Sequence, residues 1–336
     1  MAIIFCQVVA CTSPQSNISP TSETDAYRED TLGGERVLIP TGISKEVFYP
    51  TIVKQGDPNA RAAARKLSLS ELAEITRPIL AKYPDLSSNP LKTGHLKRIL
   101  HDFPDFKNEQ TVREKADVIL QYYNGLIKSE LKLAIEEALK RKGSGRVANG
   151  SFGNINSLEW QHLNNNPIMI PAYQWASQRA LAETSARFGT VDEGLRGNAF
   201  QHAVWNCLII REAMYRSYSK NNAILFTRNI TSDHECNDDG SRKYGNNEAM
   251  DLHNNLSARS WFGNNSSGSV WPFSINCPSE ADIYSAWYHA ATNRNFHICN
   301  PATTITAMFS WDFLYGEARA DMGDKLYFFM PILPGC

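Results

Sequence analysis

The sequence predicts a mainly α-helical protein, in which a flexible tether precedes a helical N-terminal domain and a helical C-terminal domain. Three observations predict this fold class: long segments carry apolar residues at helical spacing, strand patterns are few, and no repeat has a solenoid period. The chain has 336 residues, of which 42% are hydrophobic and 10% aromatic. This composition excludes a wholly disordered chain, and the length favours two domains or one large domain with an added segment.

The charge of the chain is nearly balanced, with 34 Lys and Arg residues against 35 Asp and Glu residues. Proteins that bind nucleic acid or an acidic membrane through their overall charge carry a clear excess of basic residues. Nucleic acid is therefore a disfavoured partner, although a local basic groove stays compatible with the sequence. No run approaches the roughly 18 apolar residues of a membrane-spanning helix.

Residues 1–25 are predicted to be a lipoprotein-like signal and tether. Their first part is apolar and as long as the core of a signal peptide, although no basic residue precedes it. It ends in Val8-Val9-Ala10-Cys11, which resembles the bacterial lipobox, and a run rich in Ser, Pro, Asn and Thr follows. We expect Cys11 to be lipidated and the protein to be anchored in the bacterial cell envelope or secreted. The alternative is a frayed, slightly apolar N-terminus.

Seven cysteines are too few for a disulfide scaffold. Removal of the signal would take Cys6 with it, and lipidation would use Cys11. Of the five that remain, Cys207 lies in a strongly apolar run and is expected to be a buried thiol. The other four allow up to two disulfides, whose pairing the sequence does not determine.

Residues 26–150 are predicted to form the helical N-terminal domain. Ser68 and Glu71 have the spacing of a capping box before an apolar run, so a helix is expected to begin there. The longest periodic segment, 109–142, ends in basic residues followed by glycine, which is a helix stop. The stretch before Ser68 shows no clear period. The Gly-, Ser- and Asn-rich segment 143–156 is the predicted domain boundary.

Residues 151–336 are predicted to form a second helical domain, which carries the functional motifs. Its segment 196–218 is apolar around most of the helix circumference and is therefore expected to be buried. Residues 263–278 are rich in Gly, Ser and Asn, a composition typical of a loop. Helices are expected over 173–188, 196–218, 222–234, 248–261, 281–291 and 309–320.

A polar stripe crosses the apolar helix, because Asn198, His202 and Asn206 are spaced four residues apart. A buried polar group must be hydrogen-bonded, or it destabilises the fold. The stripe therefore needs partners from other helices, from a ligand or from a metal ion. A satisfied structural network in the core is the alternative to a functional site.

Candidate partners follow along the chain. His234 and Glu235 are adjacent and would point about 100° apart on a helix, so they can face one ligand only if the helix stops there. The turn-like residues that follow make such a stop reasonable. Asp251, Asn254 and Asn255 share one face of the next predicted helix, where Asp251 also fits a role near the helix N-terminus.

The chain contains, in this order, the motifs Asn198-Ala199-x-x-His202-x-x-Trp205, His234-Glu235 and Met250-Asp251-x-x-Asn254-Asn255. Together they resemble a family of poorly characterised bacterial domains, found in secreted and cell-surface proteins and at the C-termini of polymorphic-toxin-like proteins. The family commonly has Arg where this chain has Gln201, and a shorter span between its second and third motifs. The resemblance covers roughly residues 173–261 and implies a helical domain with a His/Glu/Asp/Asn cluster, without settling a reaction.

These residues support two chemical hypotheses. In the first, His202, His234 and Asp251 bind a divalent ion such as zinc, and a water on that ion is the hydrolytic nucleophile. In the second, one His is a general base and Glu235 an acid, with Asn amides orienting the substrate. The candidate catalytic residues are His202, His234, Glu235 and Asp251, and the candidate substrate-binding residues are Asn198, Asn206, Asn254 and Asn255.

Several familiar catalytic motifs are missing from the sequence: His-Glu-x-x-His, Gly-x-Ser-x-Gly and the phosphate-binding P-loop. A Cys–His nucleophile would have to use Cys207 or Cys236. Two functions stay open. One is a hydrolase, toxin-like and exported, that acts on an envelope or macromolecular substrate; the other is a noncatalytic surface lipoprotein whose polar cluster is structural.

The lipobox hypothesis predicts that Cys11→Ser removes the lipid anchor. In cells fed a radiolabelled fatty acid, the parent protein should incorporate label and sediment with membranes. The Cys11→Ser variant should do neither, whereas Cys6→Ser should behave like the parent once processed. Equal labelling of the Cys11→Ser variant would contradict the hypothesis.

Overall fold

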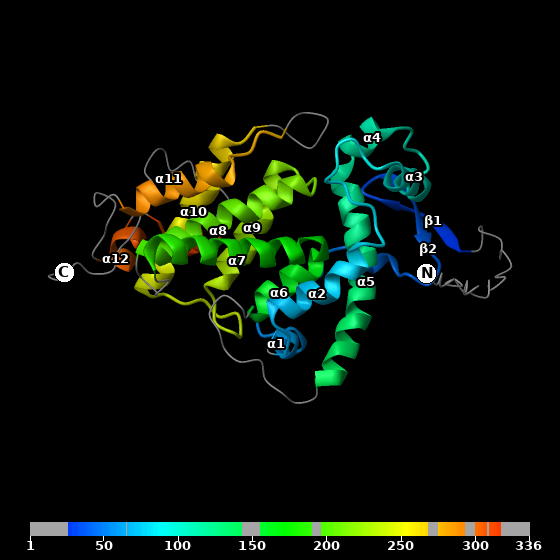
Figure 1. Ribbon diagram of the computed structural model, residues 1–336. Helices are drawn as coiled ribbons and strands as arrows, with labels where there is room; N and C mark the ends of the chain where they lie inside the picture. Colours follow the sequence, from blue (N-terminus) through cyan, green and yellow to red (C-terminus); the bar gives the residue numbers. More distant parts are fainter. Residues whose placement is uncertain are drawn as a thin grey trace, which may run out of the picture.

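A computed structural model describes residues 26–64, 66–142, 155–189, 196–267, 275–292, 300–307 and 309–316. The fold is mainly α-helical, as the sequence predicted (Figure 1). The predicted signal and tether, with Cys11, lie outside the described residues. In chain order the helices are α1 Pro58–Ala64, α2 Leu69–Leu80, α3 Thr93–Asp102, α4 Glu109–Glu114, α5 Ala116–Lys142, α6 Ser157–Asn165, α7 Ile170–Phe188, α8 Arg196–Tyr215, α9 Lys220–His234, α10 Asn246–Asn265, α11 Glu280–Thr292, α12 Pro301–Thr306 and α13 Trp311–Gly316.

A β-hairpin precedes these helices, in a segment where the sequence showed no clear period. Strands β1 (Tyr27–Leu32) and β2 (Glu35–Pro40) pair antiparallel, and the two-residue turn between them is Gly33-Gly34. Both glycines have positive φ, 55° and 85°, which side chains at those positions would strain. The hairpin lies beside α3, α4 and the upper part of α5 (Figure 1).

The predicted helix signals of the N-terminal segment are confirmed with one adjustment. Ser68 caps α2, and Ser68 and Glu71 form both hydrogen bonds of a capping box. The long periodic segment 109–142 forms α4 and α5, which are separated at Lys115, where φ and ψ are −106° and 20°. Helix α5 ends at the predicted basic residues.

Helix α8 is the central element of the C-terminal helices. It packs against α7, α9, α10 and α11, and most of its residues are buried (Figure 1). This is the environment that its nearly continuous apolar character predicted. Helices α7 to α11 correspond to five of the predicted helices, with boundaries displaced by a few residues.

The N-terminal and C-terminal helices share one continuous hydrophobic core. Helix α2 packs on α7, and α1 packs on α6. The side chain of Gln161 joins the halves further, since it accepts from the backbone N–H of Lys54 and donates to its carbonyl. Most of the predicted boundary, 143–156, lies outside the described residues. No helix in the described ranges has both the length and the hydropathy that crossing a membrane requires.

The contact between the 3-10 turn η2 (Lys45–Phe48) and α5 requires a glycine. A Cβ built on Gly125 would lie 3.0 Å from Cα of Phe48 and closer still to its ring. Gly125→Ala should therefore lower the free energy of unfolding by about 1–3 kcal/mol, as overpacking does. Gly94→Ala is the control, because nothing lies within 4 Å of that Cβ, and its stability should stay unchanged or rise slightly. Equal unfolding curves for the two variants would contradict this packing.

Candidate functional site

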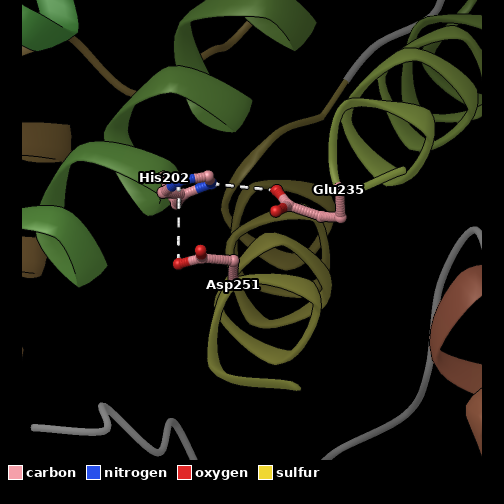
Figure 2. A group of neighbouring side chains, drawn as sticks. All are labelled: His202, Glu235 and Asp251. Atoms are coloured by element: carbon pink, nitrogen blue, oxygen red, sulfur yellow. Dashed lines mark ion pairs between the residues drawn. The ribbon is translucent and has the colours of Figure 1, made fainter. Parts of the chain in front are cut away.

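Three helices bring one imidazole and two carboxylates together in the core. His202 comes from α8, Glu235 directly follows α9, and Asp251 comes from α10 (Figure 2). One ligand atom from each lies within 4.8 Å of the other two. His202 Nδ1 is 3.4 Å from Glu235 Oε1, and His202 Nε2 is 3.6 Å from Asp251 Oδ1. We call these three residues the His–Glu–Asp centre.

The end of α9 decides which residues reach the centre. The helix stops at His234, and Glu235 is its C-cap, so the expected helix stop is present. The backbone of Glu235 leaves the helix with φ −76° and ψ 0°. Because the chain turns here, Glu235 faces His202 (Figure 2), while the side chain of His234 contacts α6.

The centre is buried and carries opposed charges. The three residues are only 3–6% exposed. Burial and the positive charge of His234 lower the pKa of His202 to about 3, while a hydrogen bond with Asn255 acts in the opposite direction. Burial, followed by the charge of Asp251, raises the pKa of Glu235 well above its usual range. Burial thus favours a neutral imidazole, and the two carboxyl groups repel each other when both are ionised.

His234, a predicted ligand, lies beside the centre and is held by a different partner. Its Nδ1 is 2.9 Å from Oε1 of Glu159, which also accepts from the Tyr173 hydroxyl at 2.6 Å. The ring centroids of His234 and His202 are 6.1 Å apart. Burial opposes protonation of His234, but the charges of Glu159 and Glu235 outweigh it and raise its pKa to about 9. The carboxylate that joins His202 and Asp251 is that of Glu235.

Two of the predicted asparagines, Asn206 and Asn255, form hydrogen bonds that lead to Glu235 of the centre. Asn206 donates to Oδ1 of Asn255 at 2.6 Å, and Asn255 donates to Oε1 of Glu235 at 3.4 Å. Oδ1 of Asn206 accepts from Thr231 and from Arg259, which is fully buried. This network orients Glu235, so Asn206 and Asn255 are placed to position a carboxylate.

The other two predicted asparagines are placed differently. Asn198 is buried one helical turn before His202, and Asn254 is fully buried on α10. Neither side-chain amide atom of Asn254 makes a hydrogen bond, and the same holds for Gln201. Substrate binding by Asn198 and Asn254 stays a prediction.

Two His–carboxylate contacts join α6 to the end of α9, and the sequence did not predict them. Glu159 binds His234, and Nε2 of His162 lies 2.7 Å from Oδ2 of Asp233. These contacts fix the segment that carries Glu235. A signal was present in the sequence, since Asn156 and Glu159 have capping-box spacing and form that box at the start of α6.

The thiols near the centre do not have the character of nucleophiles. Cys207, Cys236 and Cys277 are free. Cys207 is fully buried, as expected, and burial raises its pKa far above the usual value. Burial, followed by the charges of Asp233 and Glu235, raises the pKa of Cys236 to about 12. The reactive form is the thiolate, so both thiols are disfavoured as nucleophiles.

A comparison of two buried carboxylates tests whether the centre is structural. Asp102 accepts from Arg98 and Tyr123 and lies 2.9 Å from Nδ1 of His101, so Asp102→Asn should cost about 3 kcal/mol of stability. Without metal, Asp251→Asn should cost little or should stabilise, because it removes a charge that opposes Glu235.

The stability change caused by Asp251→Asn is expected to depend on pH. Folding raises the pKa of the Glu235 carboxyl, so the folded state favours its protonated form. The stability that this contributes is fully present below the unfolded pKa, about 4.3, and is lost as the pH rises toward the folded pKa. The gain from Asp251→Asn, measured by denaturant unfolding with chelator present, should therefore grow between pH 5 and pH 8. A loss as large as that of Asp102→Asn at both pH values would show that the centre is a structural network.

The segment that holds this centre is similar to a known family domain. The model of a family described as a domain of unknown function (DUF6973) matches residues 160–280. No curated protein and no solved structure matches the chain. The matched segment contains His202, Glu235 and Asp251. The match is consistent with the expected resemblance to a poorly characterised family.

Proposed function

We propose that the protein is a metal-dependent hydrolase whose ion binds at the His–Glu–Asp centre. The observation that supports the proposal is the convergence of His202, Glu235 and Asp251 from three helices within 4.8 Å. Contacts of 3.4 Å and 3.6 Å within the centre are longer than the usual hydrogen bonds of a structural network.

The donor set fits a divalent ion. A neutral imidazole and two carboxylates together carry up to two negative charges, which a divalent cation neutralises. Three protein ligands leave at least one position open, as in catalytic rather than structural sites. Ligand atoms around a tetrahedral ion with bonds of about 2.1 Å are about 3.4 Å apart, so the ligand atoms of the centre, now within 4.8 Å of one another, would move closer together on binding.

The surrounding residues hold the ligands in position. Asn255 donates to the carboxylate of Glu235, and the buried network of Asn206, Thr231 and Arg259 holds Asn255. His234, fixed by Glu159, adds positive charge beside the two carboxylates. An ion bound here would lower the pKa of a coordinated water and so supply a nucleophile at neutral pH. Such outer partners commonly affect metal affinity as well as orientation.

The cellular setting of the proposal comes from the sequence alone. The lipobox-like Cys11 supports an exported, lipid-anchored protein, and the motif resemblance supports a toxin-like domain. The substrate class that follows is an envelope component or another macromolecule. A noncatalytic, partner-binding lipoprotein is the second candidate, in which the centre would serve the fold only.

Metal binding by the purified full chain tests the proposal. After chelation, calorimetric titration with Zn²⁺ or Mn²⁺ should give one site per chain and a rise in Tm. His202→Ala and Asp251→Ala should weaken binding by at least about 100-fold, since even outer partners contribute 10–100-fold. His95→Ala is the control, because this histidine lies on α3 in the N-terminal half.

A hydrolysis assay of the metal-loaded protein tests the catalytic part of the proposal. The metal-loaded protein should hydrolyse at least one member of a panel of ester, phosphodiester, amide and glycosidic substrates. His202→Ala should abolish that activity while its metal-free Tm stays close to that of the parent. Absence of metal binding and of metal-dependent stabilisation would contradict the proposed function.

A further inference from the structure

A second feature lies next to the centre, on the outer side of the segment that carries Glu235. It is a cavity of about 650 Å³, within the range of small-molecule sites. Its walls come from α6, the end of α9, the loop 236–244 and the end of α13. Ser232 and Cys236, which flank the segment with Glu235, both line it.

The charged side chains in the wall are already engaged by protein groups. Arg242 pairs with Asp312 at 2.6 Å and lies over the ring of Tyr315. His162 pairs with Asp233, and Arg228 donates to the Gly316 carbonyl at 2.8 Å. A charged ligand would therefore have to compete with existing contacts, which disfavours anions and cations as occupants.

Uncharged hydrogen-bonding groups make up much of the remaining wall. Gln55 and Asn229 offer side-chain amides, whereas the hydroxyl of Ser241 already donates to Asp239 and accepts from Asn237. The hydroxyl of Ser232 is the strongest indication of a polar ligand, because this residue is only 2% exposed and its Oγ makes no hydrogen bond. A buried hydroxyl without a partner costs free energy, which a ligand hydroxyl could recover.

An aromatic side chain stands at the rim of the cavity. Tyr244 lines the cavity, yet 60% of it is exposed. Its ring packs edge-on against Trp311 and Tyr315, at centroid distances of 5.3 Å and 6.4 Å, which fixes its orientation. A fixed, exposed ring beside uncharged hydrogen-bonding groups suits a ligand that has both an apolar C–H face and hydroxyls.

We propose that this cavity binds a neutral oligosaccharide. Sugar rings stack their C–H faces on an aromatic ring such as that of Tyr244, and their hydroxyls match Gln55, Asn229 and Ser232. The proposal is independent of the metal centre and requires neither a bound ion nor hydrolysis. A glycan held here would lie beside the segment that positions Glu235.

Titration of the full chain with cellotriose and chitotriose tests the proposal, with binding followed by calorimetry. At least one trisaccharide should bind, in the presence or absence of chelator. Tyr244→Ala should weaken that binding about tenfold or more, as expected for an aromatic anchor. Ser232→Ala should weaken it by a smaller factor without lowering Tm, because its hydroxyl makes no hydrogen bond in the free protein.

Tyr49→Ala is the matched control, since Tyr49 is 47% exposed and lines a different cavity. It should bind the trisaccharide like the parent, and all variants should show parental circular dichroism spectra. The proposal is overturned if neither trisaccharide binds at millimolar concentration, if Tyr244→Ala binds like the parent, or if inorganic phosphate displaces the sugar. Loss of metal binding with intact sugar binding would reject the proposed hydrolase and leave this inference standing.

Discussion

Two carboxyl groups and an imidazole lie within contact distance inside a helical core, and much of the surrounding structure compensates for them. Burial of ionisable groups is unfavourable unless partners or a counter-charge accompany them. Helix α8 brings His202 to this position because the helix is apolar on nearly all sides and must be buried. Glu235 and Asp251 arrive from the neighbouring helices α9 and α10 (Figure 2).

Groups on two sides of the centre offset its buried charges. The amide of Asn255 contacts Glu235, and Arg259 brings a buried positive charge to the same network. On the other side, His234 brings a second positive charge, and Glu159 and Tyr173 hold that imidazole. The N-terminal helices contribute indirectly, because α1 packs on α6, the helix that carries Glu159. A divalent ion would complete this balance of charge.

Local signals in the sequence predicted the helices well. Contacts between residues far apart in the chain could not be predicted from such signals. The capping box at Ser68 and the helix stop after His234 depend on a few neighbouring residues, and both are present. Glu235 and not His234 faces Asp251 and His202, because His234 is held by Glu159, which lies 75 residues away from it in the chain. The hairpin at β1 and β2 was missed because β1 is polar along most of its length and shows no alternation of apolar and polar residues. The shared core likewise follows from contacts such as α2 on α7, which have no local signature.

The most direct measurement of the central claim is X-ray absorption spectroscopy of the full chain loaded with one equivalent of Zn²⁺. The account predicts a first shell of nitrogen and oxygen ligands at about 2.0–2.2 Å, with outer-shell scattering from a single imidazole and no sulfur. The imidazole signal should disappear in His202→Ala and persist in His234→Ala. A shell with sulfur ligands, or an imidazole signal that depends on His234 and not on His202, would contradict the account.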